Sequence, residues 1–285
     1  RAEDPTEGKL LRVELLRNSS IMEMDDAQTL GAAGLLEAEA VTTVIYKRNE
    51  VEASTKDDVP VHTLGLFHVN IPLNCIQISS SAFKYCKNIV SVTITESVSH
   101  VGESAFEDCK SLASITFGES VTHIERRAFA GCTSLTNITL GESVTHVQER
   151  AFACCTCLAS ITLGESVTHI GKHAFHACIS LVSITMGGSV THIGECALQG
   201  CTSLVSISLD KSVVDLGDGA FEGCTSLASV FLCESVTQIG FSVFGGCKSL
   251  VSITLGESVT HIGENAFENC KSLASITLGE SVTHV

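Results

Sequence analysis

The chain has 285 residues, of which 44% are hydrophobic and 17% charged, a composition that excludes a disordered protein. Its formal net charge of −15 argues against a nucleic-acid partner and against binding to anionic membrane surfaces. No apolar run reaches the ~18 residues that a membrane-spanning helix needs. With no tryptophan and two tyrosines, the core must consist mainly of small aliphatic side chains, which favours a thin, repetitive layer.

Residues 1–68 carry no cysteine and do not follow the pattern of the later sequence. The predicted elements, in chain order, are a strand at 9–16 (KLLRVELL), a helix at 25–40 (DDAQTLGAAGLLEAEA), a strand at 40–46 (AVTTVIY) and a polar linker at 47–60. We interpret this segment as a small α/β cap, because the first coil of a stacked repeat has to be covered. The alternative is a separate docking element.

A 23-residue repeat occupies the remainder of the chain, from about residue 69 to 285. Nine cysteines keep this period: Cys86, Cys109, Cys132, Cys155, Cys178, Cys201, Cys224, Cys247 and Cys270. Such regularity is typical of solenoids, in which each coil buries its apolar residues only against its neighbours. Because the chain starts without methionine and stops in mid-repeat at Val285, we expect both ends to be limits of a cut or processed chain.

One coil is enough to predict the local structure. The segment 135–140 (LTNITL) predicts a short strand with its apolar residues inside and its polar residues outside. The segment 120–124 (SVTHI) turns its valine and isoleucine inward, and 126–132 (RRAFAGC) predicts a tight helical or 3-10 turn. Stacked at about 4.8 Å, such coils bury continuous columns of leucine, isoleucine, valine, phenylalanine and cysteine.

The pattern VTxIGxxAFxxCxxLxxIxL, as in residues 259–278, resembles the BspA-like (treponemal-type) leucine-rich repeat family. The resemblance implies a right-handed solenoid with a parallel sheet on one face and short helical turns on the other. Members occur on bacterial surfaces and in unicellular eukaryotes, where adhesion and protein binding are the usual proposed roles. The family shares no catalytic residues, so none is expected here.

A glutamate stands four residues before a histidine in six coils: Glu96/His100, Glu119/His123, Glu142/His146, Glu165/His169, Glu257/His261 and Glu280/His284. Catalysis needs one asymmetric group of residues, whereas a pair copied along a surface forms no unique pocket. We therefore expect solvent-facing rows and no active site. Stacked histidines resist simultaneous protonation, which predicts modest destabilisation or altered binding near pH ~5.

The nine periodic cysteines are expected to be reduced and packed in the core, which favours a reducing intracellular or organellar compartment, with the cell surface as the alternative. Off this column, Cys154 and Cys157 form a C-x-x-C spacing, and His173 and His176 follow one coil later. This group could hold zinc. The alternative is neutral drift at tolerant surface positions, and no metal or other cofactor is expected.

Departures from the repeat are the better candidates for partner contacts. Phe231 and Phe241 stand where neighbouring coils carry polar residues and could anchor a partner, or they are single exposed apolar residues. Basic residues occupy matching turns of successive coils, with His173 beside them: Arg126, Arg127, Arg150 and Lys172. They form either a positive stripe for an acidic partner or lipid headgroup, or a balance to the neighbouring glutamates.

The predicted function is a non-catalytic scaffold for protein–protein interaction or adhesion. The alternative is a structural subunit built permanently into a large complex, membrane-associated and organellar, of a unicellular eukaryote. A third reading is a metal-binding or enzymatic protein that uses the Cys154–Cys157 and His173–His176 group.

Overall fold

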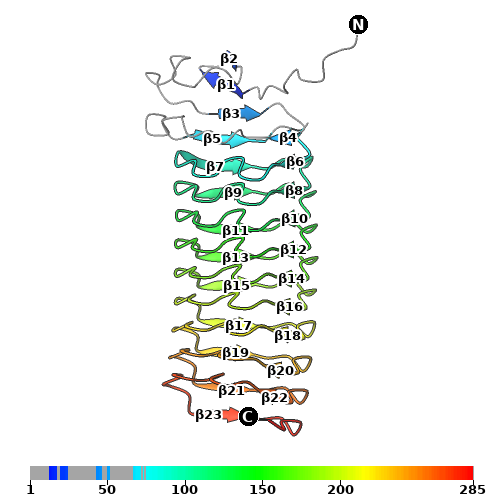
Figure 1. Cartoon of the computed structure of the whole chain (residues 1–285), viewed down its shortest axis with the longest axis vertical. Coiled ribbons are helices and arrows are strands. Elements are labelled where there is room, and N and C mark those ends of the chain that lie inside the picture. Colours follow the sequence, from blue (N-terminus) through cyan, green and yellow to red (C-terminus); the bar gives the residue numbers. More distant parts are fainter. Residues whose placement is uncertain are drawn as a thin grey trace.

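The computed structural model describes residues 67–71, 73 and 75–284 and, nearer the N-terminus, the backbone of four strands. These four are β1 (Val13–Arg17), β2 (Ser20–Met24), β3 (Thr43–Tyr46) and β4 (Glu50–Val51). The described chain is a solenoid of stacked coils, and each coil contributes one strand to each of two walls (Figure 1). No helix long and apolar enough to cross a membrane occurs among the residues described.

The first wall contains the longer strand of each coil. Its strands are β5 (Phe67–Asn70), β7 (Ile89–Thr93), β9 (Ser114–Thr116), β11 (Asn137–Thr139), β13 (Ser160–Thr162), β15 (Ser183–Thr185), β17 (Ser206–Ser208), β19 (Ser229–Phe231), β21 (Ser252–Thr254) and β23 (Ser275–Thr277). Pairing is parallel, and apart from a register shift at Phe67 each paired residue faces the one 23 positions later, as Ile138 does with Ile161. Equivalent residues therefore form straight columns, and the predicted solenoid with a parallel sheet is confirmed.

The second wall consists of two-residue strands: β6 (Gln77–Ile78), β8 (His100–Val101), β10 (His123–Ile124), β12 (His146–Val147), β14 (His169–Ile170), β16 (His192–Ile193), β18 (Asp215–Leu216), β20 (Gln238–Ile239) and β22 (His261–Ile262). In this wall the isoleucine, valine or leucine is buried in nearly every strand, and the polar residue before it faces outward. The coils thus present a repeated polar column along the second wall.

Strand pairing is interrupted at several steps. The first wall breaks between β9 and β11 and between β15 and β17, and the second breaks between β18 and β20. Only the pair Phe231–Thr254 joins β19 to β21. At these steps the coils are held by their shared core and turns more than by the strand ladder.

The third side of each coil is a run of hydrogen-bonded turns, and the described residues contain no helix there or elsewhere. In a helix every amide would bond four residues back along the chain. Here the amides alternate: Ala105 donates to the Gly102 carbonyl (3.1 Å), whereas Ser104 donates to the carbonyl of Arg126 in the next coil (2.9 Å). Ser104 has a φ of 55°, so the segment cannot continue as a helix.

The core is a set of single-residue columns. Neighbouring phenylalanine rings stack in parallel, with centroid separations of 5.3 Å for Phe129–Phe152 and 5.6 Å for Phe152–Phe175. The thiol of Cys155 donates to the Phe129 carbonyl at 3.2 Å, and the other periodic cysteines from Cys109 onward repeat this bond. All fourteen cysteines are free thiols, and burial raises the pKa of the interior ones well above the usual range.

The predicted strands at 9–16 and 40–46 overlap β1 and β3, whereas the predicted helix at 25–40 lies outside the described residues. β1 pairs antiparallel with β2 and with β3, and β3 pairs parallel with β5. The stretch expected to be a polar linker contains β4, which pairs parallel with β6. Strand ladders of both walls therefore extend into the first 68 residues.

Candidate functional site

Among the residues whose exposure the structure describes, Phe231 is the largest exposed apolar side chain of the first wall. The serine and threonine residues of this wall face solvent along most of its length. At the end of β19, Phe231 stands in the column between Ser208 and Thr254 and is 64% exposed. Val205 and Val251, just before β17 and β21, are exposed as well. Apolar side chains therefore interrupt the polar surface of the first wall at these positions.

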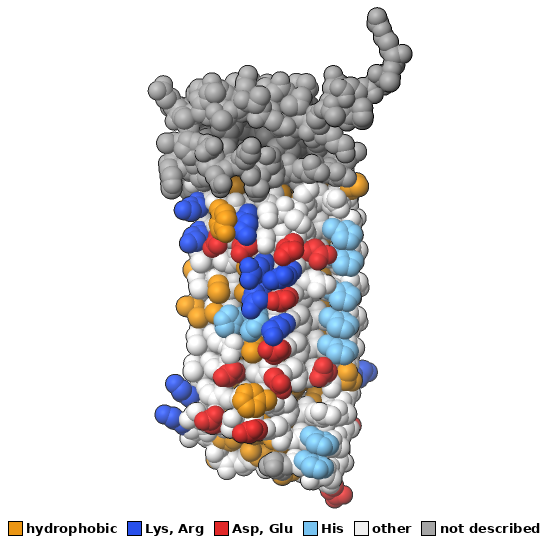
Figure 2. All heavy atoms as spheres, in the orientation of Figure 1, with side chains coloured by type: hydrophobic (Ala, Val, Ile, Leu, Met, Phe, Trp, Pro, Cys, Tyr) orange, Lys and Arg blue, Asp and Glu red, His pale blue; other side chains and the backbone are white. Residues whose placement is uncertain are grey.

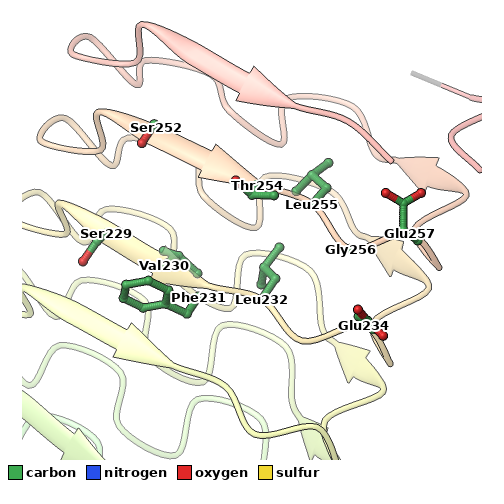
Figure 3. Close-up of a pocket in the computed structure, with 10 residues that line it drawn as sticks. All are labelled: Ser229, Val230, Phe231, Leu232, Glu234, Ser252, Thr254, Leu255, Gly256 and Glu257. Atoms are coloured by element: carbon green, nitrogen blue, oxygen red, sulfur yellow. The ribbon is translucent and has the colours of Figure 1, made fainter. Parts of the chain in front are cut away.

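A groove of about 410 Å³ lies beside Phe231, between β19 and β21 (Figure 3). Leu232 and Leu255 contribute apolar surface, and Glu234 and Glu257 contribute carboxylates. The groove occurs where a single residue pair joins the two strands. A second groove of about 400 Å³ lies at the break between β9 and β11, with Phe117 and Leu140 in its lining.

Phe241 does not share a surface with Phe231. It follows β20 of the second wall, at the start of the turn run, and is 49% exposed. Its backbone amide donates to the Asp218 carboxylate at 2.8 Å. The two predicted aromatic contacts therefore belong to different sides of the coil.

The four predicted basic residues lie on the turn side, among carboxylates (Figure 2). One column alternates in charge along five coils: Glu103, Arg126, Glu149, Lys172 and Glu195. Within it, Arg126 lies 3.8 Å from each neighbouring glutamate, and Lys172 lies 2.7 Å from Glu195. The hydrogen bond from Lys172 lowers the pKa of Glu195.

The column beside it contains Arg127 and Arg150, and each of them also has an acidic partner. Arg127 lies 3.8 Å from Glu107, and Arg150 binds the carboxylate of Glu149. The basic residues of the positive stripe are therefore interleaved with a similar number of acidic residues.

The predicted cysteine–histidine group is only partly brought together. The His173 and His176 rings meet edge to face at 5.3 Å, and the backbone amide of Cys154 donates to the His176 carbonyl at 2.8 Å. The side chains of Cys154 and Cys157 are exposed.

A different trio is assembled nearby. Among the described residues, His173, Glu195 and Cys196 form the one group of three possible metal ligands, with ligand atoms within 4.8 Å of one another. Cys196 lies 23 residues after His173, so the repeat period alone predicts that these two residues are neighbours in adjacent coils. The Glu195 carboxylate is already paired with Lys172, however. Desolvation by burial, and then the nearby charge of Arg150, lowers the pKa of His173. Positive charge at this position opposes a bound cation.

Three of the six glutamates of the Glu–His pairs accept a hydrogen bond from a backbone amide of the next coil. Glu142 accepts a hydrogen bond from the Glu165 amide (2.9 Å), and Glu165 accepts one from the Gly188 amide (2.8 Å). Glu257 does the same for Glu280. These three carboxylates thus tie their coils to the next one, and their hydrogen bonds are structural.

The histidines form a column along the edge of the second wall (Figure 2). Partial burial, followed by the charges of His192 and His146, lowers the pKa of His169. The unfolded chain therefore takes up this proton more readily than the folded chain does. The neutral His169 ring therefore makes its full contribution to stability above the ordinary histidine pKa of about 6.5, and this contribution is lost as the pH falls below that value.

We expect the thermal unfolding midpoint to be lower at about pH 5.5 than at about pH 8, because protonation of His169 favours the unfolded chain. Replacing His169 by glutamine should reduce this difference, whereas His176→Gln, outside the column, should preserve it. Differential scanning calorimetry at both pH values gives the comparison, and equal midpoints for the wild-type chain would contradict the prediction.

Parallel in-register coils, short strands and columns of identical core residues define a leucine-rich-repeat solenoid. The BspA type leucine rich repeat region matches residues 62–182 and 168–285, with six copies. The chain belongs to the BspA-type leucine-rich repeat family.

Similar solved structures come from several bacteria. The pneumococcal vaccine antigen PcpA is 18% identical, with a TM-score of 0.53 over 84% of this chain and 69% of that one. A leucine rich cell surface protein of Faecalibacterium prausnitzii is 24% identical (TM-score 0.41; 84% and 91% covered). The leucine rich repeat protein of T. pallidum is 26% identical (TM-score 0.41; 82% and 84% covered). The search of curated proteins gave no match.

Proposed function

We propose that the chain is a non-catalytic scaffold that binds a protein partner on its first wall, with Phe231 as the apolar anchor. The observation that carries the proposal is the 64% exposure of Phe231 beside a groove of about 410 Å³. Binding energy at protein interfaces concentrates in aromatic side chains that become buried in the complex. The family membership supports an interaction role, since solenoids use their extended faces for binding.

The groove also indicates the chemistry of the partner. Leu232 and Leu255 offer apolar contact, while Glu234 and Glu257 place two carboxylates in the lining. An apolar side chain with a lysine or arginine close to it on the partner would satisfy both. The net charge of −15 favours such a partner by steering basic surfaces toward the solenoid.

The test is capture of partners from the native source by the immobilised chain, followed by quantitative mass spectrometry. Phe231→Ser should reduce retention of the partner by at least about tenfold, as loss of an interface anchor does. Phe241→Ser is the matched control, because it removes an exposed phenylalanine from another side of the same coil and should leave retention unchanged. Equal retention by the wild-type chain and Phe231→Ser would refute the proposed anchor.

A permanent structural subunit is the second candidate, and the breadth of the apolar patch favours it. Val182, Val205 and Val251 are all exposed at the start of first-wall strands, and permanent interfaces are more apolar than transient ones. Under this reading the partner should remain bound in stoichiometric amount through purification at high salt. A partner that exchanges during washing would favour the transient scaffold.

A further inference from the structure

The two grooves of the first wall occupy the same place in the repeat. The Phe231 groove lies between β19 and β21 (Figure 3), and the Phe117 groove lies between β9 and β11. Each residue that lines the Phe117 groove has a counterpart in the lining of the Phe231 groove 115 residues later, which is five periods of 23. Five coils stacked at about 4.8 Å place the grooves about 24 Å apart along the solenoid axis.

The coils are more widely separated at both grooves than at comparable steps. A Cβ built on Gly141, in the Phe117 groove, would lie 3.4 Å from the nearest atom of the preceding coil, and one on Gly256, in the Phe231 groove, 3.0 Å. At the four other glycines of this column the shortest such distance lies between 2.4 and 2.8 Å: Gly118, Gly164, Gly187 and Gly279. Each groove is therefore an opening between coils that a side chain can enter.

Each opening is lined by a pair of carboxylates at the same two repeat positions. The Phe117 groove has Glu119 and Glu142, and the Phe231 groove has Glu234 and Glu257. The second member of each pair is held in place, because it accepts a hydrogen bond from the backbone amide 23 residues later, at 2.9 Å for Glu142 and 3.0 Å for Glu257. Two carboxylates held beside an opening attract a lysine or arginine side chain.

The remaining break in the first wall has a different charge. Between β15 and β17 the strands do not pair either, but the two repeat positions of the glutamate pair hold Gly188 and Lys211. A basic side chain would be repelled by Lys211 there. An opening and a carboxylate pair therefore coincide at the Phe117 and Phe231 grooves and not at this third step.

We propose that one protein partner binds both grooves at once, with a lysine or arginine side chain in each, about 24 Å apart along the solenoid axis. The inference rests on the proposed function, because the Phe231 groove is one of the two contacts. An apolar side chain beside the first basic residue packs on Phe231, whereas Thr116, Thr139 and Asn137 make the other groove more polar. The first contact raises the effective concentration of the second, so the pair binds more tightly than either alone.

The first test counts the binding sites with a synthetic peptide of about six residues that alternates arginine and leucine. Isothermal titration of the full 285-residue chain, at about 0.15 M salt, should give two equivalents of bound peptide. Thr116→Arg and Thr254→Arg each place a positive charge in one groove, and each should remove one equivalent. Thr162→Arg is the matched control, because Thr162 is exposed in the same column, within the unbroken sheet β11–β13–β15, and should keep both equivalents.

The second test measures whether the two grooves cooperate. Two copies of the peptide joined by about 18 glycine and serine residues span about 24 Å on average. The joined peptide should bind the wild-type chain at least about tenfold more tightly than the single peptide, and Thr116→Arg should abolish this gain. Equal affinities of the joined and single peptides for the wild-type chain would overturn the proposal, as would two equivalents of single peptide bound to Thr116→Arg.

The partner captured from the native source separates this inference from the proposed function. Loss of retention by about tenfold or more in both Phe231→Ser and Thr116→Arg, with Thr162→Arg unaffected, supports one partner across both grooves. Loss in Phe231→Ser with full retention in Thr116→Arg would leave Phe231 as the anchor and overturn the double contact. Full retention in both variants would refute the anchor and the double contact together.

Discussion

Replacing Phe152 by alanine is expected to lower the free energy of unfolding by about 3–5 kcal/mol. The ring is fully buried and stacks on Phe129 and on Phe175, so the cavity would open on both neighbouring coils at once. In a solenoid nearly all of the stability of a coil comes from its two interfaces. Urea denaturation followed by circular dichroism measures the loss, and an unchanged transition would contradict the stacked column.

Phe152→Leu is the matched control for that experiment. The same column already contains leucine at position 198, fully buried between the coils of Phe175 and Phe221. Leucine removes fewer carbon atoms and leaves a smaller cavity, so the cost should be about 1–2 kcal/mol. A leucine variant as unstable as the alanine variant would show that ring stacking, and not filled volume, dominates the column.

Gly164→Ala is expected to destabilise the chain by about 1–3 kcal/mol, whereas Gly141→Ala, one coil earlier at the same repeat position, should have little effect. A Cβ at position 164 would lie 2.4 Å from the Gly141 carbonyl oxygen. At position 141 the nearest atom, the Gly118 carbonyl oxygen, is 3.4 Å away, which is an ordinary contact. Thermal unfolding of the two variants side by side makes the comparison.

The difference between these glycines has a structural cause. Gly141 lies at the step where pairing between β9 and β11 is broken and lines the groove found there. The coils approach each other less closely at that step, so a methyl group fits. If both variants lost the same stability, the break in the ladder would not reflect wider spacing of the coils.

The repeat period predicted most of the fold, because a strict 23-residue spacing places equivalent residues of consecutive coils above one another. Ile138 over Ile161, His146 over His169 and Phe129 over Phe152 all follow from it. The exposure of Phe231 and Phe241 also followed, since both stand at positions that are polar in other coils.

The breaks in strand pairing were not predictable from the repeat. The groove beside Phe117 occurs at the break between β9 and β11, and the groove beside Phe231 occurs where a single residue pair joins β19 to β21. The turns in place of a helix come from amides that bond to the next coil, which a pattern within one coil does not reveal. The N-terminal strands β3 and β4 lack the periodic cysteine and phenylalanine by which coils are recognised.

The charge column on the turn side has a consequence for folding. Near-identical coils can stack in the wrong order, and skipping one coil would cost little in the core, where phenylalanine would still meet phenylalanine. Along Glu103, Arg126, Glu149, Lys172 and Glu195, however, a skipped coil would bring Glu103 against Glu149, or Arg126 against Lys172. Like charges directly opposite are destabilising, so the alternation of sign in these five coils disfavours a misaligned stack that the apolar residues alone would tolerate.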